Sequence, residues 1–245
     1  SSKPTSLTSR VVAVLECRSD DVWRVIPGAT IIGNPSATIT HPAAIHEAGE
    51  FSLSWLRAGR TVPKHWQGAA LIVAEHTVGN FSTHQALIVC RNPRIGLGYA
   101  LRELFADLVA RKRVIQGSGV RLHPTAVIGQ RGNSLEWDDV RWFRIPAVAG
   151  VVIEDDVTIG AMVTIVRGVL ADTIIGAGTD VCNHVNVGHG ARIGRHCVLA
   201  PFAAIGGSAV LGERVKVWQH AAIKNGVKIG DRAVIGQSAN VLCDV

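Results

Sequence analysis

The chain has 245 residues, of which 47% are hydrophobic and 18% charged, and its net charge is +6. This balance is typical of a folded globular protein and excludes a disordered chain. No run of eighteen apolar residues occurs, and the opening segment SSKPTSLTSR has no apolar core, so we expect neither a membrane span nor an export signal.

The cysteines and basic residues indicate the cellular compartment and the kind of partner. The five cysteines form no CxxC pair and leave one thiol over, which favours reduced thiols and a cytoplasmic protein. The basic residues are dispersed and aromatic residues make up only 5% of the chain, so we expect no nucleic-acid partner. A basic surface suits an acidic protein or a phosphate-bearing small molecule.

Residues 1–114 predict a small α/β domain. The runs 70–77 and 84–93 are apolar and bounded by turn-forming residues, which is typical of buried strands. Residues 96–113 have leucine and phenylalanine at helical spacing and basic residues at the end, which predicts a helix. The segment VIQGSGV is the expected junction with a second domain.

A period of six residues dominates the rest of the chain, 115–245. From Ile175 to Val241 every sixth residue is aliphatic, and the residue four places after each is small or β-branched. A helix repeats at 3.6 residues and a strand at 2, so a period of six indicates a short strand plus a turn. Three such sides close a triangular coil, and stacked coils bury a continuous core, which predicts a β-solenoid.

The repeat begins at Leu122 and Ile128 and is interrupted twice. Residues 133–150 form an inserted loop, and a few residues around ADT precede Ile175. Loops that leave a rigid solenoid often carry binding residues, so we expect the site near these interruptions.

Several segments carry a family resemblance: ALIVCRNPR, RWFRIPAVAG, VVIEDDVTIGAMVTIVRGVLADTIIG and NHVNVGHGARIG. With them the chain resembles the left-handed parallel β-helix acyltransferases of the hexapeptide-repeat type. Within that group it is most similar to the UDP-3-O-acylglucosamine N-acyltransferases of lipid A biosynthesis and related nucleotide-sugar N-acyltransferases.

The resemblance implies both fold and activity. Residues 115–245 would be a left-handed parallel β-helix, and residues 1–114 would bind a nucleotide-sugar. The reaction would move an acyl group from acyl-CoA or acyl carrier protein to the amine of a nucleotide-linked amino sugar, in lipopolysaccharide or surface glycan biosynthesis. No permanently bound cofactor is expected, and the protein would be a homotrimer with sites between subunits.

The candidate catalytic residues are His189 and Gly207. His189 lies on a turn with its side chain outward, and Gly207 follows one coil later, with Asn225 one coil beyond it. An imidazole beside a residue without a side chain leaves a groove for a pantetheine arm. His189 can accept the proton of the attacking amine, and the resemblance assigns it the role of general base and the Gly207 N–H that of oxyanion donor. No nucleophile–base pair indicates covalent catalysis, so direct attack is the simpler mechanism.

The expected substrate contacts surround this groove. The family's aromatic nucleotide-stacking segment is missing after GEFSLSWL, so tryptophans nearby are the candidate substitutes, and a loop tryptophan would cover the groove. The family's acidic residue is Val166 here, and its second histidine is Gly226. The residues predicted to bind substrate are Asn183, Asn186, His184, Asn225, Trp55, Trp66 and Trp142.

Two other functions remain open. His184 and His220 are two coils apart on one face, as zinc ligands are in the γ-class carbonic anhydrases, which share the fold and bind zinc between subunits. That site needs a third histidine, which would fall at Val148 or at Asn225, so no metal is expected. The third possibility is a non-catalytic β-helix scaffold.

Overall fold

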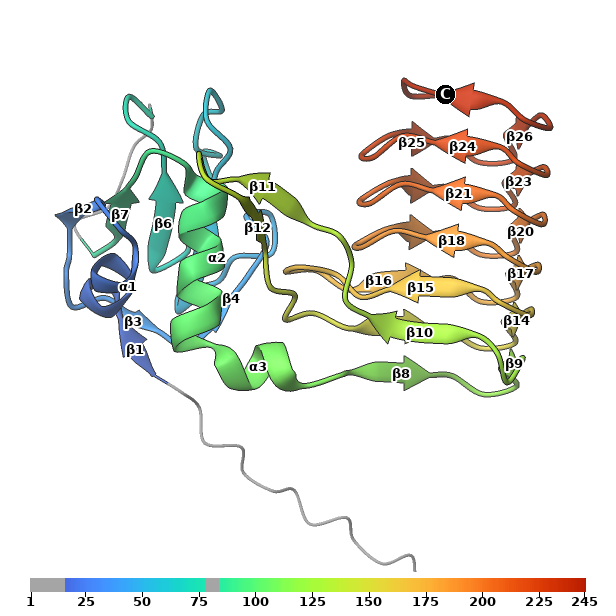
Figure 1. Cartoon of the computed structure of the whole chain (residues 1–245), viewed down its shortest axis with the longest axis horizontal. Coiled ribbons are helices and arrows are strands. Elements are labelled where there is room, and N and C mark those ends of the chain that lie inside the picture. Colours follow the sequence, from blue (N-terminus) through green and yellow to red (C-terminus); the bar gives the residue numbers. More distant parts are fainter. Residues whose placement is uncertain (1–15, 78–83) are drawn as a thin grey trace, which may run out of the picture.

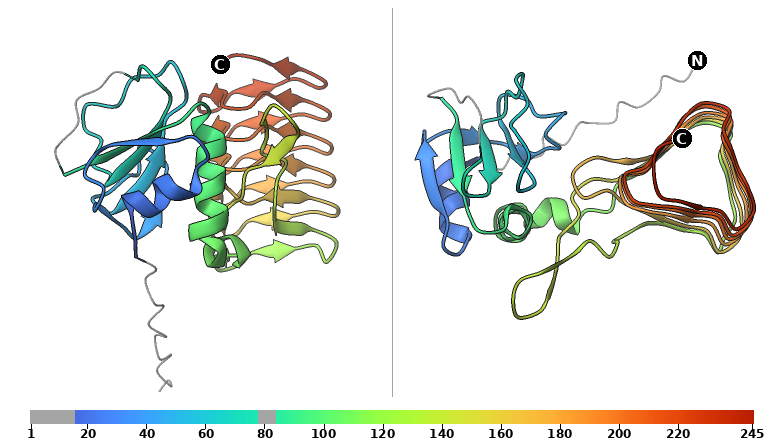
Figure 2. Two further views of the ribbon diagram at one scale, coloured as in Figure 1. Left: turned by 60° about the vertical axis from the view of Figure 1, so that its left-hand side comes forward. Right: turned by 90° about the horizontal axis from the view of Figure 1, so that it is seen from above.

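A computed structural model describes residues 16–77 and 84–245, whereas residues 1–15 and 78–83 of the predicted first domain, including SSKPTSLTSR, lie outside the description. An α/β part stands beside a regular stack of coils in Figure 1. Seen from above, the coils form a triangular prism (Figure 2). None of the helices in the described residues is long and apolar enough to cross a membrane.

Three parallel sheets form the sides of the prism, with six strands in each. Side one consists of β8 (Val114–Gln116), β13 (Val151–Ile153), β16 (Thr173–Ile175), β19 (Arg192–Ile193), β22 (Val210–Leu211) and β25 (Lys228–Ile229). Side two consists of β9 (Arg121–Leu122), β14 (Thr158–Ile159), β17 (Asp180–Val181), β20 (Val198–Leu199), β23 (Lys216–Val217) and β26 (Val234–Ile235). Side three consists of β10 (Val127–Gln130), β15 (Thr164–Val166), β18 (Asn186–Val187), β21 (Ala204–Ile205), β24 (Ala222–Ile223) and β27 (Asn240–Val241). The predicted left-handed parallel β-helix is confirmed (Figure 1).

The six-residue repeat produces this fold because it places one aliphatic side chain inside each side. Val187 pairs with Ile205 and Ile205 with Ile223, so each coil stacks on the next at a constant register. These inward positions are at most 3% exposed. At most corners the second turn residue has a left-handed φ, for example His184 at 60° and Phe202 at 63°. The cost of these turns is offset because stacking buries the core and pairs the strand backbones.

The α/β part contains a five-stranded sheet in the order β2-β7-β6-β5-β4. Its strands are β2 (Thr30–Gly33), β4 (His41–Pro42), β5 (Ser52–Trp55), β6 (Ala70–Val73) and β7 (Ala86–Val89), and all neighbours are parallel except β2 and β7. Helices α1 (Ser19–Val25) and α2 (Pro93–Leu104) contact the sheet, and β1 (Cys17–Arg18) pairs with β3 (Thr38–Ile39).

The helix expected over 96–113 is in fact two shorter ones. The first, α2, begins earlier, at Pro93, because Asn92 Oδ1 accepts the N–H groups of the first turn and proline suits the first helical position. The chain leaves the helical conformation at Phe105, whose ring is buried in the core of the α/β part. The second helix, α3 (Ala106–Ala110), then leads toward β8.

The inserted segment 133–150 is more ordered than the expected loop. It contains an antiparallel hairpin of β11 (Leu135–Trp137) and β12 (Trp142–Arg144), which packs against α2. The ring centroids of Tyr99 and Phe143 are 5.1 Å apart. A Cβ on Gly98 would collide with the Phe143 ring, so only glycine allows this approach. The hairpin therefore ties the solenoid to the α/β part.

Candidate active site

His189 follows β18 at the corner between sides three and one. A Cβ on Gly207, one coil further on, would lie 2.6 Å from the His189 Nε2 atom, so the imidazole occupies the space above that glycine. Gly132, at the start of the inserted segment, approaches the other side of the same ring, where a Cβ would lie 3.9 Å from it. The glycine neighbour expected from the repeat is therefore present, and it gives the ring its room.

Two neighbouring features determine the protonation of His189. Burial, and then the positive charge of Arg94, lowers the pKa of the imidazole below its ordinary value of 6.5. Arg94 is held in place by Glu136, whose carboxylate oxygen lies 2.8 Å from its Nη1, and by the Ser134 hydroxyl at 2.8 Å. A neutral imidazole at neutral pH can accept a proton, which is what a general base requires.

A cavity of about 770 Å³ opens between the α/β part and the solenoid at this corner. His189, Gly207 and Asn225 contribute to the solenoid wall, and Trp55 lies on the opposite wall. The lining includes the basic side chains Arg57, Arg60, Arg94 and Arg192. A cavity of this size, with an apolar lining and basic groups, fits a ligand that carries both a flat or aliphatic portion and phosphate groups.

A smaller cavity of about 220 Å³ lies on another side of His189. The two cavities share four wall residues, namely Ser134, Ile145, Val169 and His189, so they meet at the imidazole. The inserted segment supplies two of these walls, as the interruption of the repeat suggested.

The backbone N–H of Gly207 already has an acceptor in this structure. It donates to Asn225 Oδ1 at a distance of 2.8 Å. Asn183 plays the same part at another corner, where its Oδ1 accepts the Ala161 N–H at 2.8 Å. These asparagines satisfy turn amides of adjacent coils, which explains their positions without a ligand. The substrate contact predicted for Asn183 stays a prediction, and within one chain Asn183 lies at a different corner from His189 with its oxygen bonded to the Ala161 N–H.

His184 also lies away from the site. Its ring stacks on Phe202 with centroids 4.7 Å apart, and Phe202 stacks on His220 at 4.9 Å. This column runs along the corner between sides two and three, so within one chain His184 lies at a different corner from His189. Asn186 is exposed on the outer face of β18, and neither cavity at His189 includes it in its wall.

The three tryptophans have different outcomes. Trp55 is half-buried at the end of β5 and lines the larger cavity. Trp66 is only 8% exposed and packs in a small core with Leu56, Leu71 and Val73, and this packing does not support its predicted contact with substrate. Trp142 is 65% exposed at the hairpin, edge-on to Trp137, and is absent from the walls of both cavities. It does not cover the groove as expected.

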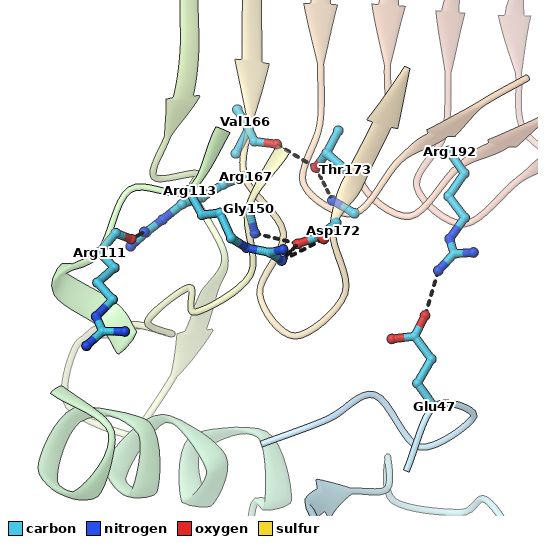
Figure 3. A network of polar contacts seen from close by, with 10 residues as sticks. Glu47, Arg111, Arg113, Gly150, Val166, Arg167, Asp172, Thr173 and Arg192 are labelled. Carbon is cyan, nitrogen blue, oxygen red and sulfur yellow. Dashed lines mark hydrogen bonds and ion pairs between the residues drawn. The ribbon is translucent and has the colours of Figure 1, made fainter. Parts of the chain in front are cut away.

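The polar contacts in Figure 3 hold the second interruption of the repeat against the first. Arg113 forms an ion pair with Asp172, which also accepts the Gly150 N–H at 2.6 Å. Thr173 accepts the Gly190 N–H at 2.8 Å, directly after His189. Arg192 reaches across to Glu47 of the α/β part at 2.6 Å. This network fixes the backbone on both sides of the His189 corner.

The residues that sequence reasoning missed are mainly arginines. Arg131 precedes the inserted segment, Arg144 lies within it in β12 and Arg167 precedes the second interruption, and all three line the smaller cavity. The two interruptions of the repeat were the sequence signal that could have identified these arginines, because a residue in or next to an insertion lies close to the solenoid surface from which the insertion leaves. Within residues 16–77 and 84–245 no three His, Cys, Asp or Glu side chains form a group that could hold a metal.

The described residues thus form a parallel β-helix of six-residue repeats with a histidine at one corner. Curated relatives are named UDP-3-O-acylglucosamine N-acyltransferase, as the sequence resemblance suggested. The relative from Methylorubrum populi is 39% identical over 129 residues, which cover 53% of this chain and 37% of the relative. The relative from Xanthomonas axonopodis pv. citri is 44% identical over 98 residues, which cover 40% and 29%. The matches thus span well under half of those relatives, and no family model matches the chain.

Two solved structures also align with the chain. One is a mutant of perosamine N-acetyltransferase from Caulobacter crescentus in complex with CoA and GDP-perosamine, at 25% identity and a TM-score of 0.41, covering 51% of this chain and 49% of that one. The other is UDP-N-acetylglucosamine acyltransferase from Francisella novicida, at 15% identity and a TM-score of 0.43, covering 81% and 60%.

Proposed function

We propose that this protein transfers an acyl group from a pantetheine thioester to the amine of a nucleotide-linked amino sugar, with His189 as general base. The observation that carries the proposal is the His189 imidazole, held over Gly207 at the meeting point of two cavities. The sequence relatives named N-acyltransferases support the reaction class.

The chemical step is a direct attack. The amine nitrogen attacks the thioester carbonyl carbon, a C–N bond forms, and the C–S bond breaks. His189 takes the proton released by the amine and passes it to the departing thiolate, so the products are an amide and a thiol. The lowered pKa of His189 keeps the imidazole neutral and ready to accept that proton.

The tetrahedral intermediate needs a donor for its oxyanion. The Gly207 N–H is our candidate, although it donates to Asn225 Oδ1 in this structure. Under the proposal the Asn225 amide turns away, or shares the N–H, when the thioester binds. Asn225 lines the larger cavity, so a bound ligand would contact its side chain directly.

The acceptor and donor are assigned to the larger cavity. Trp55 on the α/β wall would stack against the nucleotide base, and Arg57 and Arg60 on the same wall would bind the phosphate attached to the nucleoside. The pantetheine arm of acyl-CoA or acyl carrier protein would lie along the solenoid wall at Gly207. We further propose a homotrimer, because the family resemblance implies one, and light scattering that shows only an active 26.0 kDa monomer would contradict this part.

The test is an acylation assay with a panel of nucleotide-linked amino sugars and acyl donors of both carrier types, followed by mass spectrometry. We expect one amino sugar to gain an acyl group as an amide, which resists mild alkaline hydrolysis that would cleave an ester. The donor that gives the faster reaction identifies the carrier. A protein that acylates none of the sugars at a rate above the uncatalysed reaction would overturn the proposal.

A further inference from the structure

The smaller cavity at His189 has a concentration of positive charge that the reaction above does not use. Its wall includes four arginines, namely Arg102, Arg131, Arg144 and Arg167. Arg167 is only 2% exposed, and its Nε has no hydrogen-bond partner among the residues that the structure describes. A guanidinium in so buried a position ordinarily has a carboxylate partner.

In the described residues, three of these arginines contact neutral oxygens only. Arg167 donates to the Val109 carbonyl at 2.6 Å and to the Arg111 carbonyl (Figure 3). Arg131 donates to the same Val109 carbonyl at 3.2 Å. Arg144 donates to the Gly132 carbonyl at 2.9 Å and to the Asn133 side chain at 2.7 Å. Arg102 alone has a carboxylate neighbour, Glu103.

These positive charges act on one another. Burial, and then the charge of Arg131, lowers the pKa of Arg167 below its ordinary value. Two guanidinium groups that share one carbonyl oxygen, with no carboxylate between them, leave part of their donor capacity and all of their charge unmatched. An anion that enters the cavity would satisfy the buried Arg167 Nε and balance both charges.

The geometry points to an oxyanion site: we infer that this cavity binds a phosphate or carboxylate group of the acceptor, next to the amine that reacts at His189. The cavity of 220 Å³ has the volume of about seven water molecules, at roughly 30 Å³ each, so it fits one such group with part of a sugar but not a nucleotide. Guanidinium groups suit both oxyanions because their paired N–H donors match two oxygens.

The assignment of this anion to the acceptor rests on the proposed function, whereas the anion site itself does not. Because His189 is in the wall of both cavities, an anion bound in the smaller one would lie near the amine that reacts at His189. In a pantetheine thioester the phosphate is at the far end of the arm, so the donor cannot place it here. Two sources remain, namely the phosphate on the sugar of a nucleotide-sugar and a carboxylate on the sugar ring.

Binding of inorganic phosphate to the full chain tests the site without any turnover. Calorimetric titration at constant ionic strength should show saturable binding in the parent protein, and the part of it that belongs to the smaller cavity is the part that depends on Arg131 and Arg144. Arg131→Met and Arg144→Met should each weaken it by at least about tenfold, as expected when one charge-assisted hydrogen bond is lost. Arg121→Met is the matched control, since Arg121 is also exposed and bonded to a neutral oxygen, that of Thr158, but is absent from the cavity wall; it should bind phosphate like the parent.

Acetate in place of phosphate distinguishes the two sources, and tighter binding of either ion supports the site and identifies the group. If neither ion binds saturably, or if Arg131→Met and Arg144→Met bind like the parent, the inference is wrong.

A second measurement does not depend on affinity. In an NMR pH titration, the His189 ring resonances should show a higher pKa with the anion bound, because the anion offsets the nearby positive charge. If the parent protein binds phosphate in this cavity but transfers no acyl group, the proposed function is wrong and the anion site is not affected.

Discussion

The corners of the prism that carry His184 and His189 are built from the same repeat, yet they present their histidines differently. His184 is the second turn residue, with a φ of 60°, and its ring stacks on Phe202 in the next coil. His189 is the first turn residue, and the corresponding position in the next coil is Gly207. In one column each ring contacts another ring. In the other a missing side chain makes the space that the imidazole occupies.

The two corners also differ in the segments that cover them. Both interruptions of the repeat leave the solenoid at the His189 corner, and the inserted hairpin and the α/β part close over it. No insertion occurs at the His184 corner, where Phe202 stays 50% exposed. Two differences therefore separate the candidate base His189 from the surface residue His184: their positions within the turn, first and second, and the segments that cover the His189 corner.

The largest expected effect comes from His189→Ala. Acyl transfer should slow by roughly 10²–10⁴-fold, the usual contribution of a general base. Thermal melting should match the parent, because the imidazole lies outside the solenoid core. His220→Ala, on the other column, is the control and should keep the parental rate. Parental turnover by His189→Ala, in an assay limited by chemistry, would show that the base lies elsewhere.

Gly207→Ala adds a side chain next to His189, at the position where the His189 corner lacks one, and leaves the histidine in place. The added Cβ would lie 2.6 Å from Nε2, so the imidazole must move. A displacement of about 1 Å in a catalytic group costs about 10²-fold in rate. Gly236→Ala is the matched control, since a Cβ there has no atom within 4 Å. Rates that fall equally in both variants would indicate a general effect on the solenoid.

Arg94→Met should change the pH profile more than the maximal rate. Removal of this positive charge, which also leaves Glu136 unpaired, raises the pKa of His189, so the acid limb of the rate should move to higher pH. Glu136→Gln leaves Arg94 without its partner and should move the limb the other way. Acid limbs at the same pH in both variants would show that a group other than His189 titrates.

The same pKa predicts how stability responds to acid. The folded chain holds His189 with a pKa below 6.5, so it binds fewer protons than the unfolded chain once the pH falls toward that value. His189 therefore contributes stability above pH 6.5 that is lost as the pH falls through the folded-state pKa. In His189→Ala this part of the pH dependence should disappear from denaturant melts.

The smallest effect is expected for His184→Ala. Loss of one stacked ring pair should reduce the free energy of unfolding by about 1 kcal/mol, or about 2–4 °C in melting temperature for a chain of this size. The rate of acyl transfer should stay within roughly twofold of the parent, as for other surface changes. His184→Phe keeps the stack and should restore the melting temperature. A large loss of rate in His184→Ala would place substrate at this corner after all.

The sequence alone determined the solenoid, because a strict six-residue repeat is local: each coil repeats the same contacts with the next, so the pattern specifies inside, outside and register. It also identified His189 and its glycine neighbour, since residues eighteen apart must stack once the coil is known.

The remaining site depended on contacts between segments that no repeat relates. Trp66 and Trp55 look alike in sequence, but only the packing of the α/β part shows that one fills a core and the other faces the cavity. Arg94 influences the pKa of His189 through the packing of α2 on the hairpin, and Arg167 lies buried beside Arg131 only because α3 offers both the same carbonyl. A repeat specifies the contacts between each coil and the next. Long-range packing decides in which direction an insertion leaves the solenoid and which surface it covers.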